Sequence, residues 1–505
     1  MSAATAVADP GLRELAERVL AWVPKELLIG GRWQPGSNGR TFGVEDPASG
    51  EELCRVAEAE AEDCRAALGA AVAAQAELAA SPPRVRAELL RRTYERMVER
   101  KRELALLMTL EMGKTVSESE AEIDYAAEFF RWFSEEAVRI HGNYLRNPAG
   151  PGRILTLRQP VGPCLLITPW NFPAAMAARK IAPALAAGCA AVIKPAEQTP
   201  LSTLALVRIM EEEGLPAGAV NVVLTTDPAA TVEPLLEAAE LRKLSFTGST
   251  AVGKRLMARA ASNLLRLSLE LGGNAPFLVF ADADLEAAVE GAITAKLRNI
   301  GEACTAANRF LVEAPIARRF AELLAKRLAQ LRLGHGTDPA TAIGPLIDGT
   351  QLEKVKRLVE DACRRGAELL CGGKPVAGRG YFFEPTVVFA PPTEAPIARE
   401  EIFGPVAAVY PFADEREGVA LANGTEYGLV AYLYTRDLSR ALRVAEELEV
   451  GMVGLNQGIV SNPAAPFGGI KHSGFGREGG FEGIEEYLAL KYVAISDPAG
   501  GRKSN

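Results

Sequence analysis

The chain has 505 residues, of which 48% are hydrophobic and 24% charged, a composition typical of globular domains. This length exceeds one ordinary domain and excludes a peptide, a small disulfide scaffold or a fibrous protein. There are 56 Lys and Arg residues against 64 Asp and Glu, and the resulting net charge of -8 argues against a nucleic-acid-binding surface. Small-molecule chemistry is therefore the leading class of function.

The first 22 residues carry acidic side chains and lack a basic segment followed by an apolar run, so no signal peptide is predicted. The apolar stretch 181–193 contains Pro183 and is too short to cross a bilayer. The seven cysteines form no CxxC pair, which predicts neither a disulfide framework nor a zinc site. We expect a cytoplasmic protein with no metal, no membrane anchor and no nucleic-acid partner.

Residues 63–133 have nearly continuous helical periodicity and are predicted to cover one face of a sheet. Residues 153–159 and 487–496 alternate apolar and polar side chains and belong to neither of the two series described below. They are predicted either to form an outlying ribbon that offers an edge to another subunit, giving a homodimer or homotetramer, or to form an ordinary edge hairpin.

The first series of short apolar runs alternates with helical spacers, which predicts a doubly wound parallel sheet of α/β class with its ligand at the carboxyl edge. The runs are 164–168, 190–195, 219–224 and 243–249, and the spacers are 174–187, 201–213 and 232–240. A second alternating series predicts a second α/β domain. Its runs are 275–280, 309–313, 367–373, 404–412, 430–435 and 451–456.

Residues 248–254 match most of a nucleotide P-loop, but position 255 is Arg where magnesium binding needs Ser or Thr. An ATPase is therefore disfavoured. The helix that follows Gly248 and Ser249 still presents free N–H groups to an anion, so a dinucleotide pyrophosphate fits there. The first strand is not followed by the GxGxxG pattern, so any dinucleotide site differs from the usual fingerprint.

Cys304 lies among small residues, where a cysteine is either buried packing or a nucleophile open to substrate. None of the three histidines has a motif-like setting, so a nucleophilic cysteine would need another base. Glu270 lies in an otherwise apolar strand, where a lone carboxylate has a raised pKa and suits water activation. The alternative is a structural glutamate paired with a buried Arg or Lys.

Eight segments, in their order and spacing, resemble the aldehyde dehydrogenase superfamily over nearly the whole chain. They are TPWNFP (168–173), KPAEQTP (194–200), FTGST (246–250), LELGG (269–273), the Cys304 segment, YFFEPTVV (381–388), EIFGP (401–405) and PFGGIKHSG (466–474). The resemblance implies an aldehyde dehydrogenase fold with a Rossmann-like cofactor domain (1–140 and 160–273), a catalytic domain (274–475) and an oligomerisation ribbon (141–159 and 485–500).

The resemblance implies NAD(P)-dependent oxidation of an aldehyde to a carboxylic acid. Cys304 would attack the aldehyde, Asn171 and the Cys304 N–H would hold the oxyanion, and Glu270 would deprotonate the water that hydrolyses the thioester. Asn171 read alone is also an ordinary turn residue. The matching cofactor-binding positions are Thr168, Pro169, Trp170, Lys194, Glu197, Gly248, Ser249, Glu401 and Phe403.

Because a carboxylate at position 197 accepts hydrogen bonds from ribose hydroxyls and repels a 2′-phosphate, we expect NAD to be preferred, with NADP as the alternative. The C-terminal region is similar to the succinate-semialdehyde dehydrogenase branch, in which Arg179, Arg298 and Ser461 match the positions that bind the distal carboxylate. Glutarate semialdehyde, another aldehyde, or a CoA-acylating reaction are the alternatives. Each arginine read alone also fits a helix cap or a surface ion pair.

Two positions and one loop depart from the family pattern. Glu302 stands where much of the family has Gln, and it is expected to raise the pKa of Cys304 if its side chain points inward. Position 306 is Ala, so no redox switch based on neighbouring cysteines is expected. The loop 224–230 lacks the glycines of its relatives, which leaves the adenine pocket undefined.

Overall fold

The computed structural model describes residue 7 and residues 9–496. The first part of the chain is one helix, four short strands and four long helices. These are α1 (Pro10–Trp22), β1 (Leu27–Ile29), β2 (Arg32–Gln34), β3 (Thr41–Asp46), β4 (Glu51–Ala57), α2 (Ala61–Ala80), α3 (Pro83–Glu99), α4 (Lys101–Met112) and α5 (Val116–Glu136). The helical prediction for 63–133 is confirmed. The signal-peptide expectation partly concerns residues 1–6 and 8, which lie outside the described residues.

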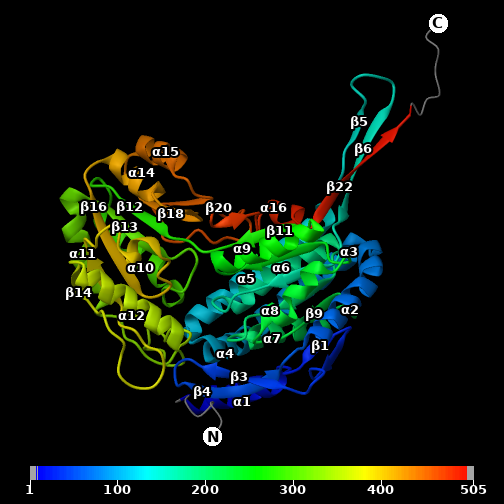
Figure 1. The fold of residues 1–505 in the computed structure, drawn as a ribbon, viewed down its shortest axis with the longest axis horizontal. Helices are drawn as coiled ribbons and strands as arrows, with labels where there is room; N and C mark the ends of the chain where they lie inside the picture. The colour runs from blue at the N-terminus through cyan, green and yellow to red at the C-terminus, as the bar shows by residue number, and fades with distance from the viewer. Residues whose placement is uncertain (1–6, 8, 497–505) are drawn as a thin grey trace.

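The first sheet has eight strands in the order β2-β1-β9-β8-β7-β10-β11-β21, and its five central strands are parallel. They are β9 (Val220–Val222), β8 (Ala191–Lys194), β7 (Cys164–Ile167), β10 (Lys243–Thr247) and β11 (Arg266–Glu270). The crossover helices are α6 (Pro173–Ala187), α7 (Pro200–Glu212) and α9 (Thr250–Ala260), seen beside the sheet in Figure 1. This confirms the doubly wound parallel sheet.

Local chemistry explains the sharp ends of α6, the helix nearest the site. Pro173 occupies its first turn, where a missing N–H costs nothing, and Gly188 ends it with a left-handed φ of 90°. The spacer predicted over 232–240 is not an α-helix. Instead there is a one-turn α8 (Pro228–Thr231) followed by a 3-10 helix at Glu233–Glu237, because Pro228 and Pro234 each permit only a new helix start.

The second sheet has seven strands in the order β14-β15-β16-β13-β12-β18-β19. They are β12 (Ala275–Val279), β13 (Ala307–Glu313), β14 (Glu368–Cys371), β15 (Thr386–Phe389), β16 (Val406–Phe412), β18 (Val430–Tyr434) and β19 (Met452–Leu455). Its helices are α10 (Leu285–Leu297), α11 (Ala314–Leu328), α12 (Gly349–Arg364), α13 (Pro396–Arg399), α14 (Glu415–Asn423) and α15 (Leu438–Glu447). All six predicted strands are present, and β15 is an additional one.

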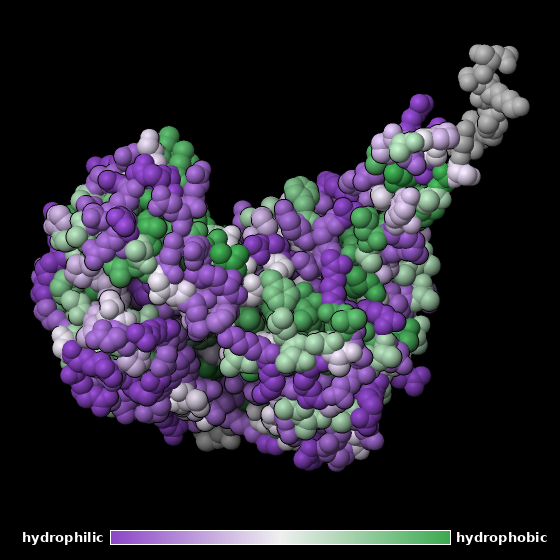
Figure 2. All heavy atoms as spheres, turned by 45° about the horizontal axis from the view of Figure 1, so that its top comes forward, coloured by the Kyte–Doolittle hydropathy of each residue, from purple (hydrophilic) through white to green (hydrophobic). Residues whose placement is uncertain are grey.

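A three-stranded ribbon rises from the molecule at the upper right of Figure 1. It consists of β5 (Tyr144–Arg146), β6 (Arg153–Pro160) and β22 (Leu488–Ile495), and β22 pairs antiparallel with β6 along its whole length. The two outlying strands therefore pair as predicted. Figure 2 shows apolar residues along this ribbon, where Tyr144, Leu490 and Tyr492 are each more than 60% exposed. Residues 497–500 of the predicted oligomerisation element lie outside the described residues.

Two large clusters of buried apolar side chains accompany the two sheets, one built mainly from residues 19–271 and the other from 275–448. The chain then returns to the first sheet through β21 (Gly474–Phe475), which pairs with β11, and through α16 (Glu482–Glu485). A small sheet of β17 (Tyr427–Gly428) and β20 (Ile470–Lys471) lies between the two parts. No helix within the described residues is long and apolar enough to cross a membrane. The domain boundaries remain predictions.

Candidate active site

The carboxyl ends of the central parallel strands bring several predicted residues to one edge of the first sheet. Thr168 follows β7, Lys194 ends β8, and Glu270 ends β11. The hydroxyl oxygens of Thr168 and of Thr247, at the end of β10, are buried and have no hydrogen-bond partner. Doubly wound sheets bind ligands at the carboxyl ends of their strands, where the strand order reverses. Buried polar atoms without partners at this place fit a polar ligand such as a dinucleotide.

A cavity of about 220 Å³ opens at this edge and reaches the second sheet's loops. Its walls include nine of the predicted site residues together with Phe172. Those lining it are Pro169, Trp170, Asn171, Phe172, Gly248, Ser249, Glu270, Cys304, Glu401 and Phe403. The three predicted catalytic side chains therefore share one cavity with most of the predicted cofactor residues.

Cys304 lies on a loop with an unusual backbone. Asn299 and Ile300 have φ angles of 55° and 62°, a left-handed conformation that is rare outside glycine and clusters at functional sites. Burial raises the pKa of the Cys304 thiol to about 12, and the positive charge of Arg179 opposes this most strongly. The resting cysteine is therefore a neutral thiol that needs a proton acceptor when it reacts.

Asn171 is held beside the cysteine loop by its own side chain. Its Nδ2 donates to the carbonyl oxygen of Glu302 at 2.9 Å, and Asn299 Nδ2 donates to the same carbonyl and to the Asn171 carbonyl, each at 2.9 Å. An amide group carries two hydrogens, so one N–H of Asn171 stays free for another acceptor. The arrangement leaves a donor near Cys304 for an oxyanion.

Glu270 is buried, and neither of its carboxyl oxygens has a hydrogen-bond partner. Burial raises its pKa well above the usual value, repulsion from Glu478 adds to the shift, and Arg179 and Lys180 oppose it. Glu270 is therefore not the structural carboxylate paired directly with a basic residue that was the alternative expectation. A lone carboxyl group with a raised pKa is suited to accept a proton.

The opposite wall of the cavity is the loop that carries Glu401 and Phe403. Glu401 accepts a hydrogen bond from the Gly273 N–H at 3.1 Å, and burial raises its pKa to about 7. Gly272 permits this approach, because a Cβ there would lie 2.8 Å from the Glu401 carboxyl oxygen. The Phe403 ring lies edge-on to Trp170, with 5.3 Å between centroids, and Gln351 donates to the Phe403 carbonyl.

The remaining predicted cofactor residues lie further along the sheet edge. Lys194 is buried and pairs with Glu197, with 3.0 Å between Nζ and Oε2, while Glu197 is 37% exposed. Neither lines the Cys304 cavity. Ser249 caps α9 by accepting from the Val252 N–H at 3.4 Å, so this helix begins where the sequence predicts. The free N–H groups of its first turn favour an anion.

A second cavity, of about 240 Å³, lies on the other side of Phe172, which lines both cavities. Arg298 Nη1 donates to Ser461 Oγ at 2.9 Å in this second cavity. The Arg298 guanidinium lies 4.8 Å from the centroid of the Phe172 ring and 5.7 Å from that of Tyr125. Two of the three predicted carboxylate-binding residues are therefore in direct contact.

Arg179 does not line either cavity itself, but its Nη1 lies 3.7 Å from the sulfur of Met176, which lines the Cys304 cavity. It is buried in α6, its guanidinium forms an ion pair with Glu478, and it lies 4.1 Å from the centroid of the Phe467 ring. Its Nη2 has no hydrogen-bond partner. The positive charge is still close enough to Cys304 to be the strongest charge acting on that thiol.

The expected effect of Glu302 on the nucleophile depended on an inward side chain, and the side chain faces elsewhere. Its Oε1 accepts from the Ile347 N–H at 3.1 Å, and it is absent from the leading charges that shift the pKa of Cys304. The two acidic residues that raise that pKa are Glu401 and Glu270. All seven cysteines, which lie within the described residues, are free.

Sequence reasoning missed Lys114, Glu122 and Asn299, which contact the Asn171 segment, and Gln351, which holds the Phe403 loop. The left-handed φ of Asn299 is only weakly indicated by the sequence, because asparagine tolerates this conformation better than most residues do. Lys114 follows Gly113 at the end of α4 and looks like an exposed helix-end lysine. Nothing in its sequence context distinguishes it.

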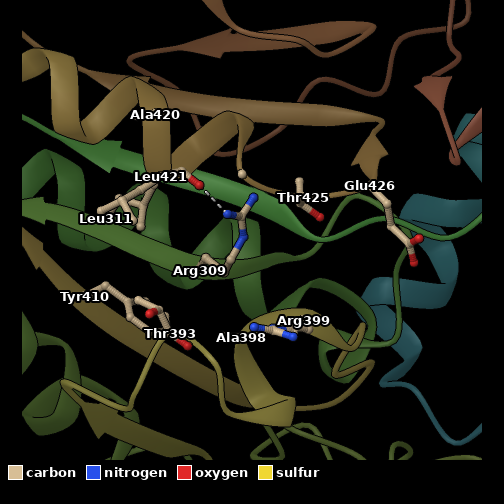
Figure 3. A pocket seen from close by; sticks show the side chains of 11 residues that line it. Arg309, Leu311, Thr393, Ala398, Arg399, Tyr410, Ala420, Leu421, Thr425 and Glu426 are labelled. Atoms are coloured by element: carbon tan, nitrogen blue, oxygen red, sulfur yellow. Dashed lines mark hydrogen bonds between the residues drawn. The ribbon is translucent and has the colours of Figure 1, made fainter.

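A larger cavity of about 520 Å³ lies between β13 and β16 of the second sheet and the ends of α13 and α14, and none of the predicted site residues lines it. Figure 3 shows Arg309 reaching from β13 toward the Leu421 carbonyl, to which it donates at 2.6 Å. Its other guanidinium hydrogen bonds also go to backbone carbonyls, those of Asn274 and Ala422. This arginine joins the second sheet to its loops.

The fold and site are those of a dinucleotide-dependent α/β enzyme with a thiol, a lone carboxyl group and an amide in one cleft. A model of the aldehyde dehydrogenase family matches residues 33–493. The chain belongs to that family, and it is an oxidoreductase that uses NAD(P) to oxidise an aldehyde to a carboxylic acid.

Named relatives are similar over nearly their full length. The chain is 56% identical to a succinate-semialdehyde dehydrogenase of Paenarthrobacter nicotinovorans, covering 88% of this chain and 99% of that protein. It is 48% identical to an NADP(+) succinate-semialdehyde dehydrogenase of Escherichia coli (93% and 98%) and 49% identical to a glutarate-semialdehyde dehydrogenase of Pseudomonas putida (94% and 98%). The crystal structure of succinate-semialdehyde dehydrogenase from Burkholderia pseudomallei has a TM-score of 0.92 at 47% identity, covering 97% and 99%.

Proposed function

We propose that this enzyme oxidises succinate semialdehyde to succinate, with Cys304 as the nucleophile. The observation that carries this choice of substrate is the hydrogen bond between Arg298 and Ser461 in a cavity that shares Phe172 with the Cys304 cleft. An arginine fork and a hydroxyl together suit the distal carboxylate of a semialdehyde. Arg179, with its unpartnered Nη2 and its influence on Cys304, adds positive charge to the same region.

The reaction begins when the Cys304 thiol releases its proton to solvent water, the sulfur attacks the aldehyde carbon and the carbonyl oxygen becomes an oxyanion. The free N–H of Asn171 and the backbone N–H of Cys304 donate hydrogen bonds to that oxyanion. NAD(P), held along the sheet edge, would supply the acceptor for the hydride that leaves this carbon, and a thioester would then remain on Cys304. Glu270 then takes a proton from water, the hydroxide attacks the thioester carbon, and the cysteine thiolate leaves as succinate forms.

We propose NAD as the preferred cofactor, with NADP as the alternative. The partly exposed carboxylate of Glu197 beside Lys194 supports NAD, because it would repel a 2′-phosphate. Ser249 and Gly248 at the start of α9 would bind the pyrophosphate, and Glu401 and Phe403 the nicotinamide ribose and ring. Thr168, Pro169 and Trp170 would line the approach between them.

The test is the production of NADH and NADPH, followed by absorbance, with succinate semialdehyde, glutarate semialdehyde and propanal. Strong preference for succinate semialdehyde over propanal, abolished in Cys304→Ala, is the expected result. Equal rates with succinate semialdehyde and with propanal would contradict the proposal that Arg298 and Ser461 bind a substrate carboxylate. Glutarate semialdehyde is the closer competitor, since one methylene changes selectivity by only about 1 to 3 kcal/mol.

A CoA-acylating reaction is the second class to distinguish. Glu270, buried and unpaired at the cavity, favours transfer to water instead of to a thiol. Adding CoA to the same assay should leave the rate of NADH production unchanged and yield free succinate. Formation of succinyl-CoA would contradict the role of Glu270.

We also propose that the enzyme is a homodimer or homotetramer. The ribbon of β5, β6 and β22 exposes Tyr144, Leu490 and Tyr492, which in a monomer would face water. Sedimentation equilibrium tests this, and a monomer at micromolar concentration would contradict it.

A further inference from the structure

Two opposite charges are buried beside the segment that carries Asn171. Lys114 Nζ lies 2.5 Å from Glu122 Oε2, and each side chain is only 1% exposed. Burying an ion pair so deeply contributes little stability, because the desolvation of both charges offsets their attraction. Apolar residues of similar volume would stabilise such a site as well or better. The role of this ion pair is therefore to be sought in the groups that Lys114 and Glu122 contact.

The pair contacts the backbone on both sides of Phe172. Lys114 Nζ also donates to the Asn171 carbonyl at 2.9 Å. Glu122 Oε1 accepts from the N–H groups of Ala174 and Ala175, at 3.1 and 3.2 Å, in the first turn of α6. The ammonium additionally lies 4.4 Å from the centroid of the Phe172 ring.

These contacts determine where the Asn171 amide points. The Asn171 carbonyl receives two donors, Lys114 Nζ and Asn299 Nδ2, which fix the peptide plane between Asn171 and Phe172. Glu122 fixes the start of α6 immediately after it. With the backbone held at both points, the Asn171 side chain can reach the Glu302 carbonyl with one N–H and direct the other toward Cys304.

We propose that Lys114 and Glu122 are positioning residues for the reaction, holding the free N–H of Asn171 where the oxyanion on Cys304 forms. This inference rests on the proposed function of Asn171. Both side chains also line the cavity that contains Arg298 and Ser461, so kcat is measured at saturating substrate to separate positioning of Asn171 from substrate binding. Their effect is on geometry, where an error of about 1 Å in a catalytic group can cost about 100-fold in rate.

The test separates positioning from stability with three variants. Lys114→Met and Glu122→Gln each leave one buried charge unpaired, so both should lower Tm as well as kcat. The double variant Lys114→Met/Glu122→Gln removes both charges and keeps an amide oxygen for Ala174 and Ala175. We expect its Tm to return toward the wild-type value while kcat stays about 10- to 100-fold low.

The matched control is the exposed ion pair between Lys101, at the start of α4, and Asp124, which lies on α5 with Glu122. Lys101→Met/Asp124→Asn should leave kcat and Tm unchanged. In the double variant at positions 114 and 122, the dissociation constant for NADH should also stay at its wild-type value. A conservative rescue, Lys114→Gln/Glu122→Gln, restores a donor near the Asn171 carbonyl and should raise kcat above that of the Met/Gln variant.

A wild-type kcat in both neutral double variants would overturn the inference, as would a kcat that recovers in step with Tm. Asn171→Ala distinguishes this from failure of the proposed function itself. If Asn171→Ala lowers kcat and the Met/Gln variant does not, only the positioning role fails. If Asn171→Ala leaves kcat unchanged, the oxyanion role of Asn171 fails.

Discussion

Arg298→Met is expected to convert the enzyme from a carboxylate-selective to a non-selective aldehyde dehydrogenase. Arg298 donates to Ser461 through Nη1, and Phe172 and Tyr125 flank its guanidinium. Methionine fills a similar volume with no donor and no charge. The aromatic contacts are largely kept, so the loss should fall on the bound carboxylate.

The size of the effect follows from the hydrogen bonds removed. The guanidinium carries five N–H donors, of which one is bonded to Ser461, so four remain and two of them can make a bidentate contact with a carboxylate. Hydrogen bonds to charged groups contribute about 1.5 to 3 kcal/mol. A loss of about 3 kcal/mol corresponds to a fall of about 150-fold in kcat/KM for succinate semialdehyde.

The assay is kcat/KM for succinate semialdehyde and for butanal, which differ in the distal carboxylate, measured on the same preparations. The value for butanal should change by less than about threefold, because butanal makes no ionic contact. Arg318→Met removes an exposed arginine on α11 and serves as the control. An equal fall for both aldehydes would refute the carboxylate role of Arg298 and indicate a structural one.

The pKa values of Glu270 and Cys304 are both raised, so the deprotonated fraction of each group increases between pH 6 and pH 9. Over that range kcat should rise, and so should the rate at which iodoacetamide alkylates Cys304. A flat profile would contradict the neutral resting thiol. Glu302→Gln should leave the alkylation profile unchanged, because that carboxyl group faces Ile347; a shifted profile would place it near the sulfur. Glu197→Gln should raise the NADP to NAD ratio of kcat/KM by about fivefold or more, since like charges about 4 Å apart in water repel by about 1 kcal/mol; an unchanged ratio would remove Glu197 from cofactor selection.

The sequence predicts those parts of the fold whose signal is local. β7, β8 and β10 are short apolar runs that predict buried strands. The helices α6 and α7 are predicted by the length and the helical periodicity of the segments between the strands. The apolar spacing of 232–240 predicts a helix, which is wrong because Pro234 within this spacer and Pro228 before it allow only short helical turns. β15 was overlooked because its four residues follow Pro385 and are too short for a clear alternation.

The site is only partly readable from sequence for a different reason. Cys304, Glu270 and Asn171 are marked by the motifs around them, and the structure brings them into one cavity. The contacts that orient Asn171 come from Lys114 and Asn299, which lie 57 and 128 positions away. Pairings over such distances depend on how the helices and loops pack, which periodicity and spacing do not encode.

The most direct test of the central claim is the covalent state of Cys304 in Glu270→Gln after mixing with succinate semialdehyde and NAD. Loss of the proton acceptor should stop hydrolysis and leave hydride transfer intact, so a stoichiometric burst of NADH should accompany accumulation of a thioester. Peptide mass spectrometry should then find a succinyl group on Cys304. Continued turnover with no acyl group on Cys304 would contradict the account.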